Sequence, residues 1–291
     1  MRRTTLSPKL IYQYAHEFSK TKKHPRGRGR PRRYSDAVVL SIAATQNLYD
    51  LSFREALEFV ARDTKVPALA TFHYRVSTLD CEYITQFLSF LGSHVQQVLE
   101  GNDVPINYAI VDGTGWSFNN VYPLRYLRGT EVRKVHAHVR VLALVGATRR
   151  RRFVVSAISG GPYASEVKMA RRVVKRVTFN RPMPLLGDKA FDAVDFLHLA
   201  KKQGAVPAVR IKTGRLATIR DPERMRSKVA AERYGKKRTF IEGLFGNVKE
   251  KTKSHIRVFK QHIAEVFALL RLTLYNLHLL VILKREGLTS W

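Results

Sequence analysis

Two aspartates that follow apolar runs are the residues of this sequence best placed to do chemistry. Asp112 comes directly after the run 108–111, and Asp188 comes directly after the run 185–187. Both runs predict strands of an α/β domain, in which ligands sit beyond the carboxyl ends of the strands. Two carboxylates at adjacent strand ends can face one pocket, and a divalent cation is the usual way to offset their repulsion.

A third acid lies on a predicted helix over residues 236–252. The apolar face of this helix consists of Ile241, Leu244 and Val248. An adjoining stripe, at spacings typical of one side of a helix, consists of Arg238, Glu242, Phe245 and Lys249. When this helix packs beside the sheet, Glu242 can point at the two aspartates. Gly243 and Gly246 each cost the helix about 1 kcal/mol relative to alanine, which a close approach of backbone or DNA would explain.

Three carboxylates can hold two Mg²⁺ or Mn²⁺ ions about 3.5–4 Å apart. One ion would activate water or a 3′-hydroxyl for in-line attack on a phosphodiester, and the other would stabilise the leaving oxygen. We therefore expect Asp112, Asp188 and Glu242 to be both metal ligands and catalytic residues. Arg238 and Lys249 are expected to hold nearby DNA phosphates.

Each acid also has a purely structural interpretation. An aspartate at a strand end is often a turn residue or a helix N-cap, and a helix is predicted soon after Asp188. A glutamate on a basic helix is often an ion-pair partner, here of Arg238 or Lys249. Asp192, four residues after Asp188, is a competing ligand. We prefer Asp188 because it directly follows the predicted strand.

The elements that must position these acids begin near residue 104. Apolar runs predict further strands over residues 138–145, 153–158, 183–186 and 205–211. Helical patterns lie between some of them, over residues 165–177 and 192–202. Strands that alternate with helices predict an α/β catalytic domain with a mixed sheet over residues 104–291, with helices in the C-terminal third.

Three short helices are predicted upstream, in a helical domain over residues 35–103. Ser35 is a plausible N-cap of the first, and Ser52 with Glu55 forms a capping box for the second. The third, near residues 67–79, carries Arg75. In a basic chain this arrangement favours a helix-turn-helix DNA reader, although a simple helical bundle has the same pattern.

Residues 1–34 are expected to form a flexible basic arm. The segment 28–31, Arg-Gly-Arg-Pro, is similar to the core of an AT-hook, which lies in the minor groove of A·T-rich DNA. The expected DNA contacts in this arm are Arg28, Arg30, Arg32 and Arg33. The alternative is a solvated linker that makes only generic phosphate contacts.

Charge separates this chain from ordinary globular proteins. Lys and Arg number 52 against 23 Asp and Glu, which gives a formal net charge of +29. Such a chain attracts polyanions, and nucleic acid is the most common polyanion for a soluble protein.

Cysteine content and hydropathy indicate an intracellular protein. Cys81 is alone, so it can form neither an internal disulfide nor a cysteine-based zinc site. The N-terminus lacks the apolar core of a signal peptide. Residues 266–283 are about long enough to span a membrane, but Arg271, Asn276 and His278 interrupt them, which predicts a buried or interface helix.

Three sequence blocks resemble the DDE-type transposases of bacterial and archaeal insertion sequences. The blocks are residues 110–114 (Ile-Val-Asp-Gly-Thr), 186–192 (Leu-Gly-Asp-Lys-Ala-Phe-Asp) and 238–246 (Arg-Thr-Phe-Ile-Glu-Gly-Leu-Phe-Gly). The family has a helix signature of Tyr, Arg, Glu and Lys, and Arg238, Glu242 and Lys249 match its last three positions. Tyr234 departs from it, with three residues before Arg238 where two are usual. Residues 29–34 and 52–55 are also similar to the family's N-terminal region.

The resemblance implies a ribonuclease-H-like catalytic domain and dependence on two Mg²⁺ or Mn²⁺ ions. It also implies recognition of the terminal inverted repeats at the ends of an insertion sequence, strand cleavage, and strand transfer into target DNA. Synapsis of two ends implies at least a homodimer. A prokaryotic, cytoplasmic and nucleoid-associated location follows from the same family.

Three other functions are compatible with parts of the pattern. A standalone metal-dependent DNA nuclease needs the same acids without strand transfer. A domesticated, inactive DNA-binding protein usually lacks one of the catalytic carboxylates, whereas this sequence has all three acids. An RNA-binding protein would place exposed aromatic residues on its strands, but the aromatic residues here lie mostly within apolar runs.

Overall fold

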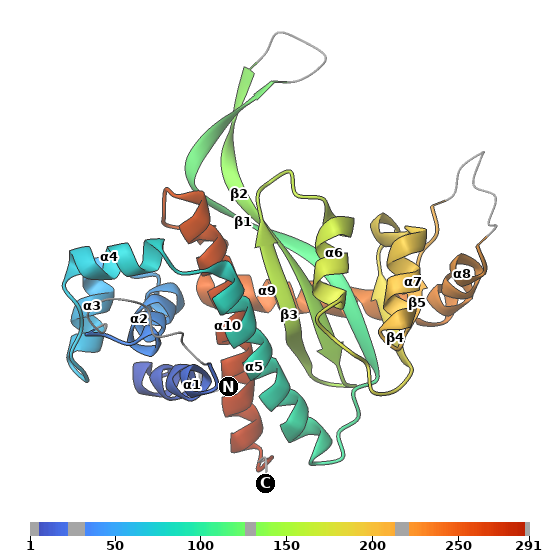
Figure 1. Cartoon of the computed structure of the whole chain (residues 1–291), viewed down its shortest axis with the longest axis horizontal. Coiled ribbons are helices and arrows are strands. Elements are labelled where there is room, and N and C mark those ends of the chain that lie inside the picture. Colours follow the sequence, from blue (N-terminus) through green and yellow to red (C-terminus); the bar gives the residue numbers. More distant parts are fainter. Residues whose placement is uncertain (1–5, 23–32, 126–131, 213–220, 289–291) are drawn as a thin grey trace.

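A computed structural model describes residues 6–22, 33–125, 132–212 and 221–288 (Figure 1). The helices are α1 (Pro8–Lys20), α2 (Asp36–Tyr49), α3 (Phe53–Ala61), α4 (Leu69–Ser77), α5 (Cys81–Glu100), α6 (Glu166–Val174), α7 (Val194–Lys202), α8 (Pro222–Tyr234), α9 (Phe240–Thr252) and α10 (Gln261–Arg285). The strands are β1 (Tyr108–Arg125), β2 (Val132–Ala147), β3 (Arg152–Gly160), β4 (Met183–Gly187), β5 (Ala205–Val209) and β6 (His255–Ile256). Two 3₁₀ turns, η1 (Lys189–Phe191) and η2 (Gly235–Thr239), complete the described elements.

A mixed sheet forms the centre of the molecule, as the sequence predicts. Its strand order is β3-β2-β1-β4-β5, and the short β6 pairs with β1. β1, β2 and β3 are antiparallel neighbours, whereas β4 and β5 run parallel to β1. The crossovers α6 and α7 cover one face, and α5 and α10 cover the other (Figure 1). Asp112 therefore lies within this sheet, and Asp188 directly follows its neighbouring strand β4.

β1 is much longer than the sequence predicts, and Asp112 does not end it. Pairing with β2 continues past Asp112 to Ser117 and, after an irregularity, resumes from Val121 to Arg125. The strand continues because Trp116 and Phe118 alternate into the core and are fully buried. The last parts of β1 and β2 project beyond the rest of the sheet (Figure 1).

The helical region shares its hydrophobic core with the sheet. One buried cluster joins side chains of α1, α2, α5 and α10 to residues of β1, β2 and β3. α5 and α10 lie between the sheet and the other N-terminal helices (Figure 1). The expected boundary near residue 103 is therefore not a break in the core. A second cluster, beneath α6 and α7, fills the opposite face of the sheet.

The N-terminal helices confirm the predicted caps and correct the predicted arm. Ser35 caps α2, and Ser52 with Glu55 forms the capping box of α3. However, residues 8–20 are not a flexible arm but helix α1. Its Ile11, Ala15 and Phe18 are buried, which places α1 against α2 and α5 and explains why this segment is ordered.

α10 is a core helix, as its interrupted hydropathy predicts. Among the described residues it is the one helix long and apolar enough to cross a membrane, yet 78% of its most apolar window is buried within the protein. Asn276 Nδ2 donates to Val154 O at 2.7 Å, and Asn276 Oδ1 accepts from Val154 N at 2.9 Å. These bonds fasten α10 to β3, so its polar residues are satisfied inside the fold.

Gly92 sets how closely α5 approaches β3, and Gly92→Ala is expected to destabilise the protein. A Cβ at this position would lie 2.5 Å from Val154 O, a backbone atom that cannot move alone. We expect a loss of about 1–3 kcal/mol in the free energy of unfolding, despite the better helix propensity of alanine. Urea unfolding measures this loss.

Gly246→Ala is the matched control for Gly92→Ala. Gly246 is also helical, and within the described part of the chain nothing lies within 4 Å of its added Cβ. This variant is expected to gain up to about 1 kcal/mol. A stabilised Gly92→Ala protein would contradict the close packing of α5 on β3.

Candidate active site

Asp112 and Asp188 lie side by side on neighbouring parallel strands. β1 pairs with β4 through Ala109 with Leu185 and Ile110 with Leu186. Two residues further along each strand, the same register brings Asp112 beside Asp188. Asp188 directly follows β4, as predicted, whereas Asp112 lies within β1. The two carboxylates are close enough for Asp188 to affect the titration of Asp112.

Arg238 connects Asp112 to the third acid, Glu242. Arg238 Nη1 donates to Asp112 Oδ2 at 2.9 Å, and Arg238 Nη2 lies 3.5 Å from Glu242 Oε1. The predicted helix from 236 divides into two elements, since Arg238 belongs to η2 and Glu242 to the first turn of α9. The Arg238 guanidinium thus joins β1 to the η2–α9 segment, which is far from β1 in the sequence.

Burial and neighbouring carboxylates raise the pKa of Asp112. Loss of solvent around the carboxylate is the largest cause, and the charges of Asp188 and Glu166 act in the same direction. The Gly113 N–H, which donates to Asp112 Oδ1 at 2.8 Å, and the Arg238 charge only partly oppose this rise. Burial is therefore the dominant influence on the pKa of Asp112, and the donors around the carboxylate do not offset it.

Asp112→Asn is expected to change how stability depends on pH. The folded protein holds the Asp112 proton to higher pH than the unfolded chain, in which aspartate titrates near about 3.9. The free energy of unfolding of the wild type therefore falls as pH rises through the folded pKa of Asp112. Asparagine does not titrate, so the variant does not show this fall. Urea unfolding from about pH 4 to pH 7 measures the difference, and parallel profiles for the two proteins would contradict the raised pKa.

Glu166 is a fourth acid at this place, and the sequence did not indicate it. It is the first residue of α6, and its Oε1 lies 3.6 Å from Arg140 Nη1. A Cβ at Gly113 would lie 3.4 Å from the same oxygen, so Glu166 lies against the β1 backbone next to Asp112. This contact depends on the crossover from β3 to α6, which local sequence patterns do not predict.

Asp192, the competing ligand, is committed to a structural role. Its two carboxylate oxygens accept from Arg224 at 2.8 and 2.6 Å, and Oδ2 also accepts from Lys212 N at 2.8 Å. Burial would raise the pKa of Asp192, but these donors outweigh burial and lower it. Asp188 Oδ1 accepts from Lys189 N at 2.7 Å and so also caps η1. Asp188 is therefore both the N-cap of η1 and the neighbour of Asp112.

The basic residues expected to contact DNA divide into three groups. Arg28, Arg30 and Arg32 lie outside the described residues, and Arg33 is exposed. Arg75 is not available, because its guanidinium pairs with Asp36 and donates to Tyr34 O at 3.0 Å, which leaves it 11% exposed. Lys249 is half-buried over the ring of Trp116, with Nζ 5.5 Å from the ring centroid.

The donor atoms around Asp112 suit Mg²⁺ or Mn²⁺, but the three predicted acids do not form a closed cage. Carboxylate oxygens are the ligands that these hard cations prefer. Across the described parts of the chain, no three His, Cys, Asp or Glu side chains are grouped closely enough to hold one ion. Arg238 lies between Asp112 and Glu242 and forms ion pairs with both, whereas Asp188 lies in register beside Asp112.

Sequence comparison gives this chain a family. The chain is 30% identical over 261 residues to an uncharacterized protein of Aquifex aeolicus (strain VF5), with 87% of this chain and 80% of the relative covered. The chain belongs to the same family as that protein. No protein-family model matches the chain.

Structural comparison finds a distant neighbour. A piggyBac transposase, solved in a synaptic complex with hairpin DNA, superposes with a TM-score of 0.46 and 10% sequence identity, over 99% of this chain and 75% of that one. A TM-score below 0.5 is too low to assign a fold or an activity.

Proposed function

We propose that this protein is a DNA transposase of the insertion-sequence type, with Asp112, Asp188 and Glu242 as its catalytic and metal-binding acids. One observation carries the proposal. Asp112 lies in register beside Asp188 and is joined to Glu242 through Arg238, so Asp112 has a neighbour from each of the other two sequence blocks. Unrelated structural acids at a strand, a turn and a helix would have no reason to converge.

The strand order supports a ribonuclease-H-like catalytic domain. Three antiparallel strands are followed by two strands parallel to the first, with helical crossovers α6 and α7. In this order β1 and β4 are neighbours although many residues separate them, and each carries one of the aspartates. Ligands in open α/β sheets bind near such strand ends.

Asp112 and Asp188 would hold the first ion, and Glu242 would complete the set for two ions. When bound, the metal supplies the Lewis acid that activates water or a 3′-hydroxyl for attack on a DNA phosphodiester. Arg238 is placed to exchange Asp112 for a DNA phosphate, since a guanidinium binds either group through paired donors. In this scheme Arg238 offsets the charges of Asp112 and Glu242 until DNA and metal bind.

The substrate would be double-stranded DNA at the terminal inverted repeats and at the target. The net charge of +29 supports such a partner. The exposed side chains of α4, such as His73 and Tyr74, are the natural candidates for base contacts in a helix-turn-helix reader. Pairing of two ends would require at least two copies of the chain, in a prokaryotic cytoplasm.

A plasmid cleavage assay tests the proposal. The substrate is a supercoiled plasmid that carries the gene of this protein with its native flanking sequences. We expect cleavage at the element's ends with Mg²⁺ or Mn²⁺, no cleavage with EDTA, and no cleavage by Asp112→Asn. Cleavage that persists in EDTA or in the variant would contradict the proposed site.

A second plasmid separates the transposase from a standalone nuclease. Transposition requires that the released 3′ ends join to target DNA, whereas a nuclease leaves free ends. We expect joined products that contain both element ends. Free ends alone would favour the nuclease, and DNA binding without cleavage would favour an inactive relative.

A further inference from the structure

A second feature of the chain, separate from the acids, is a cavity between the helical region and the start of α10. Its volume is about 420 Å³, which falls within the range of small-ligand pockets. The helical region contributes Phe53 from α3 and His73 from α4, and the segment from β6 to α10 contributes Arg257, Phe259 and Lys260. The cavity therefore joins aromatic rings to cationic side chains.

Phe259 is the unusual residue of this cavity, because its side chain is 73% exposed. An exposed ring is available for stacking, since no other described side chain covers most of it. Phe53 and His73 are the other rings, with centroids 5.8 Å apart. Ring faces that are open to solvent within a basic pocket are what nucleobases stack on.

One cationic side chain of the cavity, Arg257, is held in place. Arg257 Nη1 donates to Asp50 O at 3.2 Å and lies 3.9 Å from Asp50 Oδ2, yet the side chain is 56% exposed. Asp50 has a left-handed conformation at the end of α2, which directs its carbonyl toward Arg257. Lys260 is exposed and directly precedes α10. No carboxylate is among the described side chains that line this cavity.

The cavity lies on the same strand as the proposed catalytic aspartate. Asn119 of β1 lines it, and Asn119 N donates to Val258 O at 2.9 Å. At about 3.3 Å per residue, the strand from Asp112 to Asn119 spans roughly 23 Å. That length corresponds to about seven nucleotides of stacked strand at about 3.4 Å each. A DNA strand that ran from Asp112 to this cavity would need about that length.

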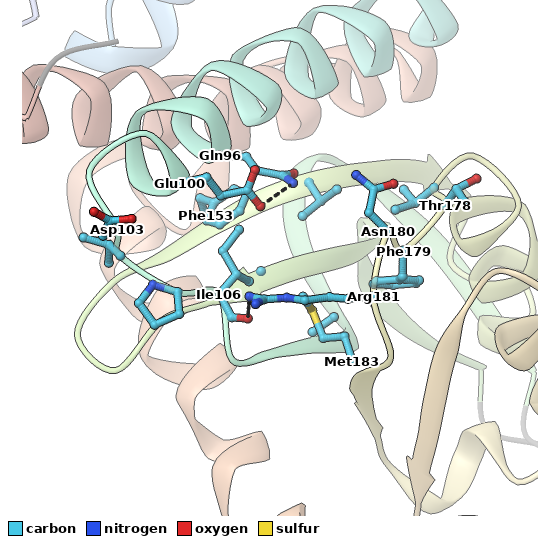
Figure 2. Close-up of a pocket in the computed structure, with 16 residues that line it drawn as sticks. Gln96, Glu100, Asp103, Ile106, Phe153, Thr178, Phe179, Asn180, Arg181 and Met183 are labelled. Carbon is cyan, nitrogen blue, oxygen red and sulfur yellow. Dashed lines mark hydrogen bonds between the residues drawn. The ribbon is translucent and has the colours of Figure 1, made fainter. Parts of the chain in front are cut away.

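Another cavity among the described residues has the opposite character. It measures about 510 Å³ and lies at the amino ends of β1 and β4 (Figure 2). Glu100 and Asp103 stand at its rim, and Arg181 Nη2 donates to Ile106 O at 2.8 Å. Its carboxylates repel phosphate, so this cavity does not suit a nucleic acid.

We infer that the cavity around Phe259 binds one unpaired nucleotide of single-stranded DNA, with the base stacked on Phe259 and the adjoining phosphates at Arg257 and Lys260. The inference rests on the proposed function, because strand cleavage and joining create unpaired nucleotides near the ends. Duplex DNA does not fit this description, since a paired base cannot leave its stack without an energetic penalty.

Binding of short oligonucleotides tests the inference. The probe is fluorescein-labelled oligothymidylate, with a labelled duplex of the same length as the comparison. Phe259→Leu, which keeps apolar volume but removes the ring, is expected to weaken single-strand binding on the order of 10-fold. Phe259→Tyr, which keeps the ring, is expected to bind as the wild type does. Duplex binding is expected to change less than about twofold in both variants.

Arg257 and Lys260 are tested through salt dependence. Each change to alanine is expected to reduce the slope of log affinity against log salt for oligothymidylate by about 0.7. Equal loss of duplex and single-strand binding in Phe259→Leu, or no loss of either, would overturn the inference. Tighter binding of oligouridylate than of oligothymidylate would instead assign the cavity to RNA. Because no variant here touches the acids, failure of this test is distinct from failure of the cleavage assay.

Discussion

Glu242→Gln is expected to reduce DNA strand cleavage on the order of 10²–10³-fold while DNA binding is retained. The change keeps the shape of the side chain and removes its negative charge. Glu242 is largely exposed, and its ion pair with Arg238, at 3.5 Å, contributes at most about 1 kcal/mol to folding. A loss of activity in this variant therefore reports on chemistry rather than on stability. Single-turnover cleavage in Mg²⁺ measures it.

Glu250→Gln is the matched control for Glu242→Gln. Glu250 lies on the same helix α9 and is exposed, but it belongs to none of the contacts around Arg238. We expect this variant to cut DNA at the wild-type rate. If Glu242→Gln instead cuts DNA at the wild-type rate, Glu242 is only an ion-pair partner of Arg238 and has no catalytic role.

Arg271→Met is expected to destabilise the fold by about 3–5 kcal/mol. Arg271 is 2% exposed, and its guanidinium donates to Lys253 O and His255 O, both at 2.9 Å, and to Asn47 Oδ1 at 3.3 Å. Burial lowers its pKa to about 10, so the side chain stays charged at neutral pH. Methionine would leave these acceptors buried without donors.

Urea unfolding measures the loss in Arg271→Met, and Lys284→Ala is the control. Lys284 lies near the exposed end of the same helix α10, so its removal is expected to change the free energy of unfolding by less than about 0.5 kcal/mol. A loss below about 1 kcal/mol in Arg271→Met would mean that water reaches the carbonyls of Lys253 and His255.

Local patterns predicted the elements whose signals lie within a few residues. The caps at Ser35 and Ser52 are confirmed, because a cap depends only on its own turn. The strand before Asp188 is also confirmed, because its apolar run is short and ends at a turn. Helix α1 was not predicted, although Ile11, Ala15 and Phe18 form a helical face. The basic residues that follow this segment led to its assignment to the arm.

Long-range pairing explains what the sequence could not predict. β1 continues past Asp112 because β2 pairs with it as far as Arg125. No local sequence pattern predicts this pairing. Arg75 has the charge expected of a DNA contact, but its ion pair with Asp36 forms only in the fold. Glu166 reaches Asp112 through the path of a crossover helix.

Binding of Mn²⁺ tests most directly whether Asp112 and Asp188 share a divalent ion. Electron paramagnetic resonance of free Mn²⁺ gives the affinity for the wild type, for Asp112→Asn and for Asp188→Asn. Asp195→Asn, on the exposed side of α7, serves as the control. We predict saturable binding by the wild type and by the control, and affinity at least about 10-fold weaker in each of the other two variants. Equal affinity in all four proteins, or no saturable binding by the wild type, would contradict the metal site.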